Sequence, residues 1–149
     1  MPFVLDGERT PRFVVNGVVV PGIRAASQTL TLQIPLIEEE FPEIGCCHRG
    51  SINIHLKNAL RIENPDHITR PIPWAGPPGE AFSLLRILLE CPVGGNPKRA
   101  WIYIPYNSPH RNNRCQVEVI AEPMQDLAYG SQCRIHIERG REDFDMIVV

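Results

Sequence analysis

The sequence predicts a single all-β domain built as a closed or nearly closed small barrel. The chain has 149 residues, which is enough for one domain with a hydrophobic core and too few for two ordinary domains. Its 15 prolines and 11 glycines divide it into short pieces and disfavour long helices. Seven or eight short segments have the residue types of β-strands. A barrel is expected because closing the sheet removes exposed strand edges.

The composition excludes several classes of protein. Apolar residues make up 43% of the chain and charged residues 21%, as in folded globular proteins. The net charge is −2 and the basic residues are scattered, so no nucleic-acid surface is expected. No apolar run approaches the roughly 20 residues that a membrane helix needs, and residues 1–7 lack the features of a secretory signal. With five cysteines, an odd number, we expect reduced thiols and a cytoplasmic location.

The N-terminal part of the barrel alternates strand and loop signals. Residues 12–20 are rich in valine, and Asn16-Gly17 in their middle is typical of a hairpin turn. A break of small residues follows at 21–27. Residues 29–34 alternate between apolar and polar side chains, which predicts a strand. Residues 36–41 are acidic and predict one or two helical turns before Pro42.

The segment 45–56 has the clearest chemical pattern of the chain. Ser51, Asn53 and His55 should point to one side of a strand, while the isoleucines and leucine between them point to the core. Hydroxyl and amide oxygens two residues apart on one face suit Mg²⁺, which prefers oxygen ligands. The alternative is an ordinary strand with one solvated face.

The C-terminal half predicts further short strands. Residues 57–66 are expected to be a connection, and residues 68–74 at best an edge strand because prolines interrupt them. Residues 81–91 suit either a buried strand or a short helix. Strands are then predicted at 100–104, 116–121 and 133–137, with polar loops between them and a helical turn at 124–129.

The two ends are expected to lie outside the barrel, which we assign to residues 12–138. Residues 1–11 predict an N-terminal arm. Residues 139–149 predict a tail whose apolar end, from Met146, is typical of a strand added to a sheet edge of this chain or of another subunit.

The order of these pieces over residues 14–138 resembles the archaeal CTP-dependent riboflavin kinases. The resemblance rests on the small-residue loop, the segments that follow it, Gly50-Ser51-Ile52-Asn53 at the start of a strand, and the later run Glu118-Val119-Ile120-Ala121-Glu122-Pro123. It implies a six-stranded cradle-loop β-barrel with one or two short helices. It also implies transfer of the γ-phosphate of CTP to the 5′-hydroxyl of riboflavin, giving FMN, by a monomer or homodimer.

The resemblance also implies roles for individual residues. Ser51 and Asn53 match the Mg²⁺ ligands, and Glu118 matches a flavin-contacting glutamate that could orient or deprotonate the attacking hydroxyl. A flavin-contacting threonine before a histidine corresponds to Ser108 or Pro109, before His110. The nucleotide-binding positions are Gly22, Ile23, Arg24, Ala25, Ala26, Ser27, Met124, Gln125, Asp126 and Leu127, with Glu122 as a one-residue insertion.

The chain departs from the family in its nucleotide loop. Only Gly22 remains of the two or three glycines that let a backbone approach phosphates closely, and Arg24 and Ala26 take the places of the others. Arg24 could supply a guanidinium to the phosphates or fill the site. The alternatives are therefore a non-catalytic barrel that binds a small ligand or a protein partner, and a kinase for another acceptor or nucleotide.

Two further patterns favour structural roles. Cys46-Cys47-His48 lacks the spacing of a zinc site, and neither thiol has an identifiable base. Four aromatic residues could stack on a flavin ring, although we expect most of them to pack in the core or at its rim: Trp74, Trp101, Tyr103 and Tyr106.

Overall fold

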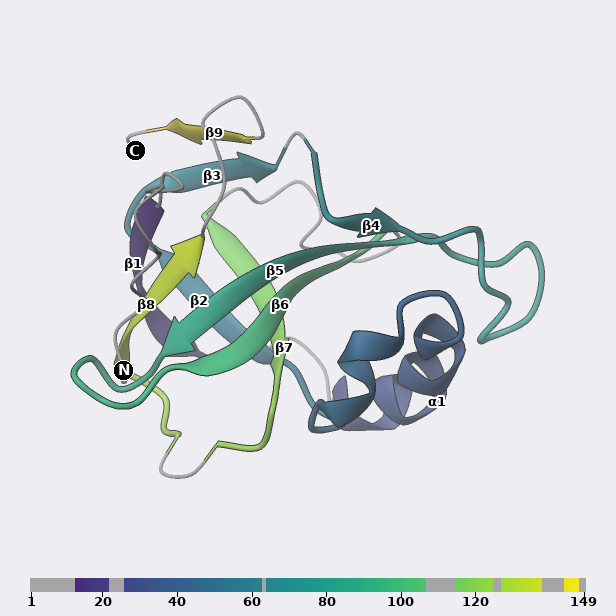
Figure 1. Ribbon diagram of the computed structural model, residues 1–149, viewed down its shortest axis with the longest axis horizontal. Coiled ribbons are helices and arrows are strands. Elements are labelled where there is room, and N and C mark those ends of the chain that lie inside the picture. Colours follow the sequence, from purple (N-terminus) through teal and green to yellow (C-terminus); the bar gives the residue numbers. More distant parts are fainter. Residues whose placement is uncertain are drawn as a thin grey trace, which may run out of the picture.

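The computed structural model describes residues 13–21, 26–62, 64–106, 115–124, 127–137 and 144–147 (Figure 1). Within these residues there are nine strands, one α-helix and one 3-10 helix. The helices are α1 (Ala26–Glu38) and η1 (Pro42–Cys46). The strands are β1 (Phe13–Val20), β2 (Ile52–Leu56), β3 (Ala59–Ile62), β4 (His67–Ile68), β5 (Phe82–Glu90), β6 (Lys98–Pro105), β7 (Gln116–Ala121), β8 (Gln132–Ile137) and β9 (Phe144–Ile147).

Six strands form a closed antiparallel barrel, which confirms the predicted fold class. Their order is β5-β6-β7-β2-β1-β8, and β8 pairs back with β5 to close the ring. The short strand β4 adds to the far end of β5. Strand β9 pairs with β3 in a separate two-stranded sheet, so the apolar tail does add a strand within its own chain. No helix in the described part of the chain is long and apolar enough to cross a membrane.

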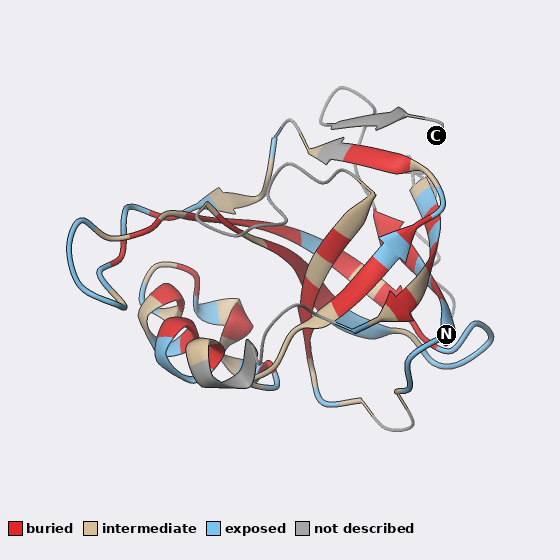
Figure 2. Ribbon diagram, turned by 180° about the vertical axis from the view of Figure 1, so that it is seen from behind, coloured by how far each residue is buried: buried red, intermediate tan, exposed pale blue. Residues whose placement is uncertain are grey.

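Strand alternation decides which side chains fill the barrel. In β2, Ile54 and Leu56 are buried in the interior core, and in β7 Val117 and Val119 lie in the same core. The residues that alternate with them along the strands, including Asn53 and Glu118, must therefore point outward. Figure 2 shows buried positions on several strands of the barrel. This interior is filled by apolar side chains, so polar chemistry is expected outside it.

A second hydrophobic core lies outside the barrel, where α1 and η1 cover one end of the sheet (Figure 1). Leu30, Ile34 and Ile37 of α1 are fully buried, at the spacing of one helix face. They pack in one cluster with outward-facing side chains of β5, β6 and β7, among them Trp101 and Ile120. The second core holds α1 over the outer face that carries the candidate site.

The strand predicted at 29–34 is wrong, because these residues belong to α1. Apolar residues at positions 30 and 34 satisfy both the helical and the strand period, so the pattern alone could not separate them. Leu32, which would share a strand face with them, is 55% exposed. Pro35 lies inside the helix, where it lacks the backbone N–H that would otherwise donate to the preceding turn.

The hairpin predicted at Asn16-Gly17 is also wrong, because β1 runs through it without a break. Gly17 instead permits close packing against β2. A Cβ atom at this position would lie 2.5 Å from Cγ2 of Ile54 and 2.9 Å from the carbonyl oxygen of His55. Glycine here serves the close approach of two strands rather than a turn.

The predictions for the segments between residues 57 and 129 are confirmed in some places and wrong in others. Residues 81–91 form strand β5, and residues 57–66 contain β3 in addition to the expected connection. The segment 68–74 contributes only the end of β4 and isolated bridges at Ile72 and Trp74, as expected of a proline-rich edge. The helical turn predicted at 124–129 is not formed by its described residues.

Candidate functional site

Pairing of β2 with β7 brings the three predicted site residues together. Asn53 is the direct cross-strand partner of Glu118. Ser51, just before β2, donates a hydrogen bond from its hydroxyl to Oε1 of Glu118 at 3.2 Å. These residues are 67 positions apart in the chain, and only the strand register places them side by side. All three belong to the outer face of the barrel.

Asn53 carries an unsatisfied acceptor at this site. Its side chain is only 8% exposed, and Oδ1 has no hydrogen-bond partner in the described part of the structure. Buried polar atoms are normally paired, so such an oxygen points to a missing donor or cation. The Asn53 amide oxygen and the Ser51 hydroxyl are both oxygen donors of the kind that Mg²⁺ prefers. Among the described residues, His, Cys, Asp and Glu form no group of three that could hold a metal.

A buried hydrogen bond ties α1 to the neighbourhood of Glu118. The hydroxyl of Tyr103 on β6 donates to Oε1 of Gln33 on α1, and both side chains are buried. Burial raises the pKa of Tyr103, and the negative charges of Glu118 and Glu80 raise it further. The phenol therefore stays protonated and remains a donor. Sequence reasoning missed Gln33 because it placed this residue in a strand.

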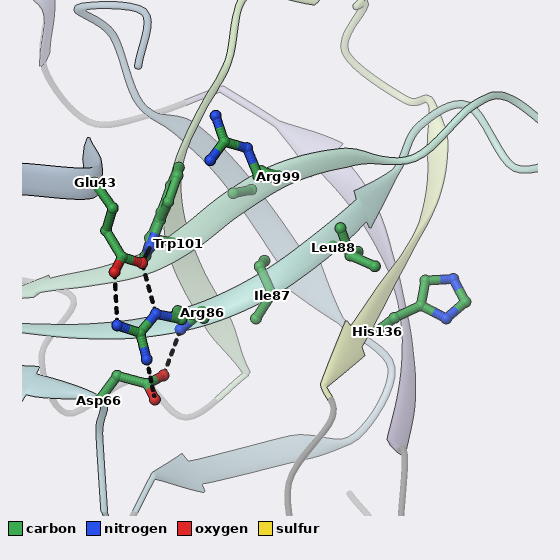
Figure 3. A pocket seen from close by; sticks show the side chains of 9 residues that line it. Glu43, Asp66, Arg86, Ile87, Leu88, Arg99, Trp101 and His136 are labelled. Carbon is green, nitrogen blue, oxygen red and sulfur yellow. Dashed lines mark hydrogen bonds and ion pairs between the residues drawn. The ribbon is translucent and has the colours of Figure 1, made fainter. Parts of the chain in front are cut away.

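A separate pocket of about 530 Å³ lies on the outer face of β5 and β6 beside η1 (Figure 3). Its charged groups bind one another. The Arg86 guanidinium donates two 2.6 Å hydrogen bonds to the carboxylate of Glu43 and one of 3.3 Å to Asp66, and Trp101 Nε1 donates to Glu43 at 2.8 Å. The Arg86 hydrogen bonds hold the pKa of Glu43 below its usual value despite partial burial. The other lining residues are Ile87, Leu88, Arg99, Ala100 and His136.

The predicted nucleotide segments are only partly described. Ala26 and Ser27 are the first residues of α1, so the break of small residues predicted at 21–27 is wrong for these two positions. Met124 and Leu127 are partly buried against the barrel core, so their side chains help to pack it. The predicted positions that lie outside the described residues are Gly22, Ile23, Arg24, Ala25, Ser108, Pro109, His110, Gln125 and Asp126.

The cysteine pair and the large aromatic residues have structural contacts. Burial raises the pKa of Cys47 to about 12, so its thiol is protonated at neutral pH and unsuited to be a nucleophile. Cys46 is exposed and its thiol donates to the carbonyl oxygen of Glu43 at 3.4 Å. Trp101 and Tyr103 are buried in the second core, as expected of packing residues.

Comparison with known proteins adds no assignment, since no protein-family model and no curated protein matches the chain.

Proposed function

We propose that this protein is a Mg²⁺-assisted phosphotransferase that moves the γ-phosphate of CTP to the 5′-hydroxyl of riboflavin. One observation carries the proposal: the buried, unpartnered Oδ1 of Asn53 lies beside Glu118 and Ser51 on the outer face of the barrel. These are the residues that the resemblance assigns to the metal and to the acceptor. The closeness of these three residues supports the assignment, because it arises only when two strands far apart in the sequence pair in one particular register.

Ser51 and Asn53 would hold the metal ion, which when bound offsets negative charge on the transferred phosphate. Ser51 can keep its hydrogen bond to Glu118 in that arrangement, because a hydroxyl has two acceptor lone pairs in addition to its proton. That bond fixes one carboxylate oxygen of Glu118. A carboxylate held in this way would orient the acceptor hydroxyl and receive its proton.

The nucleotide would lie against the segments 22–27 and 124–127, as the resemblance implies. The glycine-poor loop also favours a second candidate, a barrel of the same fold that binds a small ligand without transferring phosphate. A kinase for another acceptor or nucleotide would use the same three side chains. Turnover assays with different nucleotides separate these functions.

The test is turnover of riboflavin with Mg²⁺ and each of CTP, ATP, GTP and UTP, followed by chromatographic separation of the flavins. We expect FMN with CTP and its loss in Asn53→Ala. The matched control is His55→Ala, because His55 is exposed and belongs to the same strand. This variant should keep full activity.

Each outcome of the turnover assay is informative. FMN formed with another nucleotide would retain the chemistry and overturn the specificity for CTP. Absence of FMN with every nucleotide, from protein shown to be folded, would overturn the riboflavin kinase proposal. In that case a melting temperature that rises with CTP and Mg²⁺ would favour a binding protein or a kinase for another acceptor.

A further inference from the structure

The segment leading into β2 contains a second buried polar atom without a partner. Arg49 stands two residues before Ser51 and four before Asn53. Its Nη1 atom is buried and makes no hydrogen bond within the described structure. A donor and an acceptor, both unsatisfied, therefore belong to residues four positions apart at the start of β2.

An unpaired guanidinium nitrogen is unfavourable in a folded protein. Removing it from water without an acceptor loses hydration that nothing replaces. The neighbouring Cys47 does not supply an anionic acceptor, because burial raises its pKa to about 12 and keeps its thiol neutral. The charge of Arg49 opposes that rise in pKa. The charge of Glu122 also raises the pKa of Cys47. The Glu122 carboxylate, however, already accepts a hydrogen bond from Arg99 at 2.9 Å.

The two unsatisfied atoms have opposite requirements. Asn53 Oδ1 needs a cation or a donor, whereas Arg49 Nη1 needs an acceptor, best an anionic one. They do not satisfy each other, since neither has a partner. A polyphosphate that carries a divalent metal ion meets both requirements at once.

We propose that Arg49 binds a phosphate oxygen of the polyphosphate whose metal ion is held by Ser51 and Asn53. The inference rests on the proposed function, because it concerns the same site and the same nucleotide. It adds a residue that the resemblance does not assign. It also accounts for the glycine-poor loop, since a guanidinium supplied next to β2 can replace phosphate contacts that a glycine-rich backbone would make.

The experiment measures binding of inorganic tripolyphosphate with Mg²⁺ to the full chain by titration calorimetry. Arg49→Gln should weaken binding roughly 10- to 100-fold, the range expected for one charge-assisted hydrogen bond. Arg49→Lys should lie between this variant and the unmodified protein, because it keeps the charge and loses the planar donor group. The matched control is Arg70→Gln, because Arg70 is 60% exposed and binds Glu40 on another part of the surface. This control should bind as the unmodified protein does.

A second readout guards against a variant that is merely unfolded. Arg49→Gln should leave the melting temperature without ligand unchanged or raise it, because no hydrogen bond of Nη1 is lost. A variant that loses binding and melts several degrees lower would overturn the proposal, since Arg49 would then have a structural role. Equal binding by Arg49→Gln and the unmodified protein, or equal loss in Arg70→Gln, would also overturn it.

Failure of this inference can be told from failure of the proposed function. Tripolyphosphate binding that depends on Arg49 without formation of FMN would overturn riboflavin kinase and support the role of Arg49. Formation of FMN together with tripolyphosphate binding that does not depend on Arg49 would support riboflavin kinase and overturn the role of Arg49. A folded protein that does not bind tripolyphosphate would overturn the role of Arg49 whatever the flavin assay gives.

Discussion

Asn53 and Ile54 are neighbours in the chain, yet their side chains have different functions. Ile54 is fully buried inside the barrel, whereas Asn53 lies on the outer face beside Glu118. Ile54 contributes to stability through packing. Asn53 makes no hydrogen bond at Oδ1, so this atom does not stabilise the fold by hydrogen bonding.

This difference predicts the stability of two alanine variants. Asn53→Ala should lower the free energy of unfolding by no more than about 1 kcal/mol, because no hydrogen bond to Oδ1 is broken. Ile54→Ala should lower it by about 2–5 kcal/mol, because it leaves a cavity in the core. Urea denaturation of the ligand-free proteins measures both values. Equal destabilisation would show that Asn53 is held by contacts that stabilise the fold.

A second prediction concerns the glycine at the crossing of β1 and β2. Gly17→Ala should destabilise the protein by about 1–3 kcal/mol, because the new methyl group would overlap Ile54 and the backbone of His55. The control is Gly45→Ala, whose methyl group would have the flexible side chain of Glu38 as its nearest contact. Thermal unfolding of both variants tests this difference, and a Gly17→Ala variant as stable as its control would contradict it.

Part of the site can be read from residue alternation alone. The pattern of segment 45–56 places Ser51 and Asn53 on one face, and the valines beside Glu118 place its side chain away from the core. The pairing of Asn53 with Glu118 depends on a register between distant strands, which no local pattern contains. The burial of Arg49 Nη1 was not predicted either, because an arginine beside a glycine is ordinarily solvated.

At the scale of elements, α1 is the largest difference between expectation and structure. Its residues alternate as in a strand, and threonine and proline both lower helix propensity. Packing outweighs these local preferences, because Leu30, Ile34 and Ile37 bury one helix face against the barrel. The strands of the barrel were easier to predict because valine- and isoleucine-rich segments agree with their final environment.

A helix at Ala26–Glu38 predicts that alanine substitutions at Ile34 and Leu32 affect stability differently, whereas a strand would not. Ile34→Ala should lower the free energy of unfolding by about 2–5 kcal/mol, whereas Leu32→Ala should change it by less than about 0.5 kcal/mol. In a strand both side chains would share one face and respond alike. Chemical denaturation of the two variants separates these alternatives, and similar losses would argue against the helix.

At the scale of the whole molecule, carboxylates on several elements form contacts that favour their charged form. The pKa of Glu43 is lowered chiefly by Arg86, and that of Glu122 chiefly by Arg99. Glu90, near the seam where β5 and β8 close the barrel, has a pKa lowered by the backbone N–H of Gly94 and then by His136. These interactions link distant parts of the chain around the barrel.

The lowered pKa values predict how stability depends on pH. A carboxyl group with a lower pKa in the folded state stabilises the protein above its unfolded pKa of 4.5, and this contribution is lost as pH falls through the folded pKa. The melting temperature should therefore decrease as pH is lowered below about 4.5. Glu43→Gln should reduce the steepness of that decrease, and an unchanged slope would exclude Glu43 as a contributor. Thermal melts across this range provide the measurement.

The alternation of side chains along β2 and β7 has a consequence for how such a protein can change over evolutionary time. Positions that face inward, and outward positions such as Ile120 that pack in the second core, determine whether the chain folds, whereas the other outward positions contribute less to packing. Under the proposed function, a new acceptor or a new nucleotide could be selected by replacing outward positions such as Ser51 or Glu118 without disturbing the packed interior. Libraries restricted to these outward positions should therefore yield many folded proteins with altered recognition.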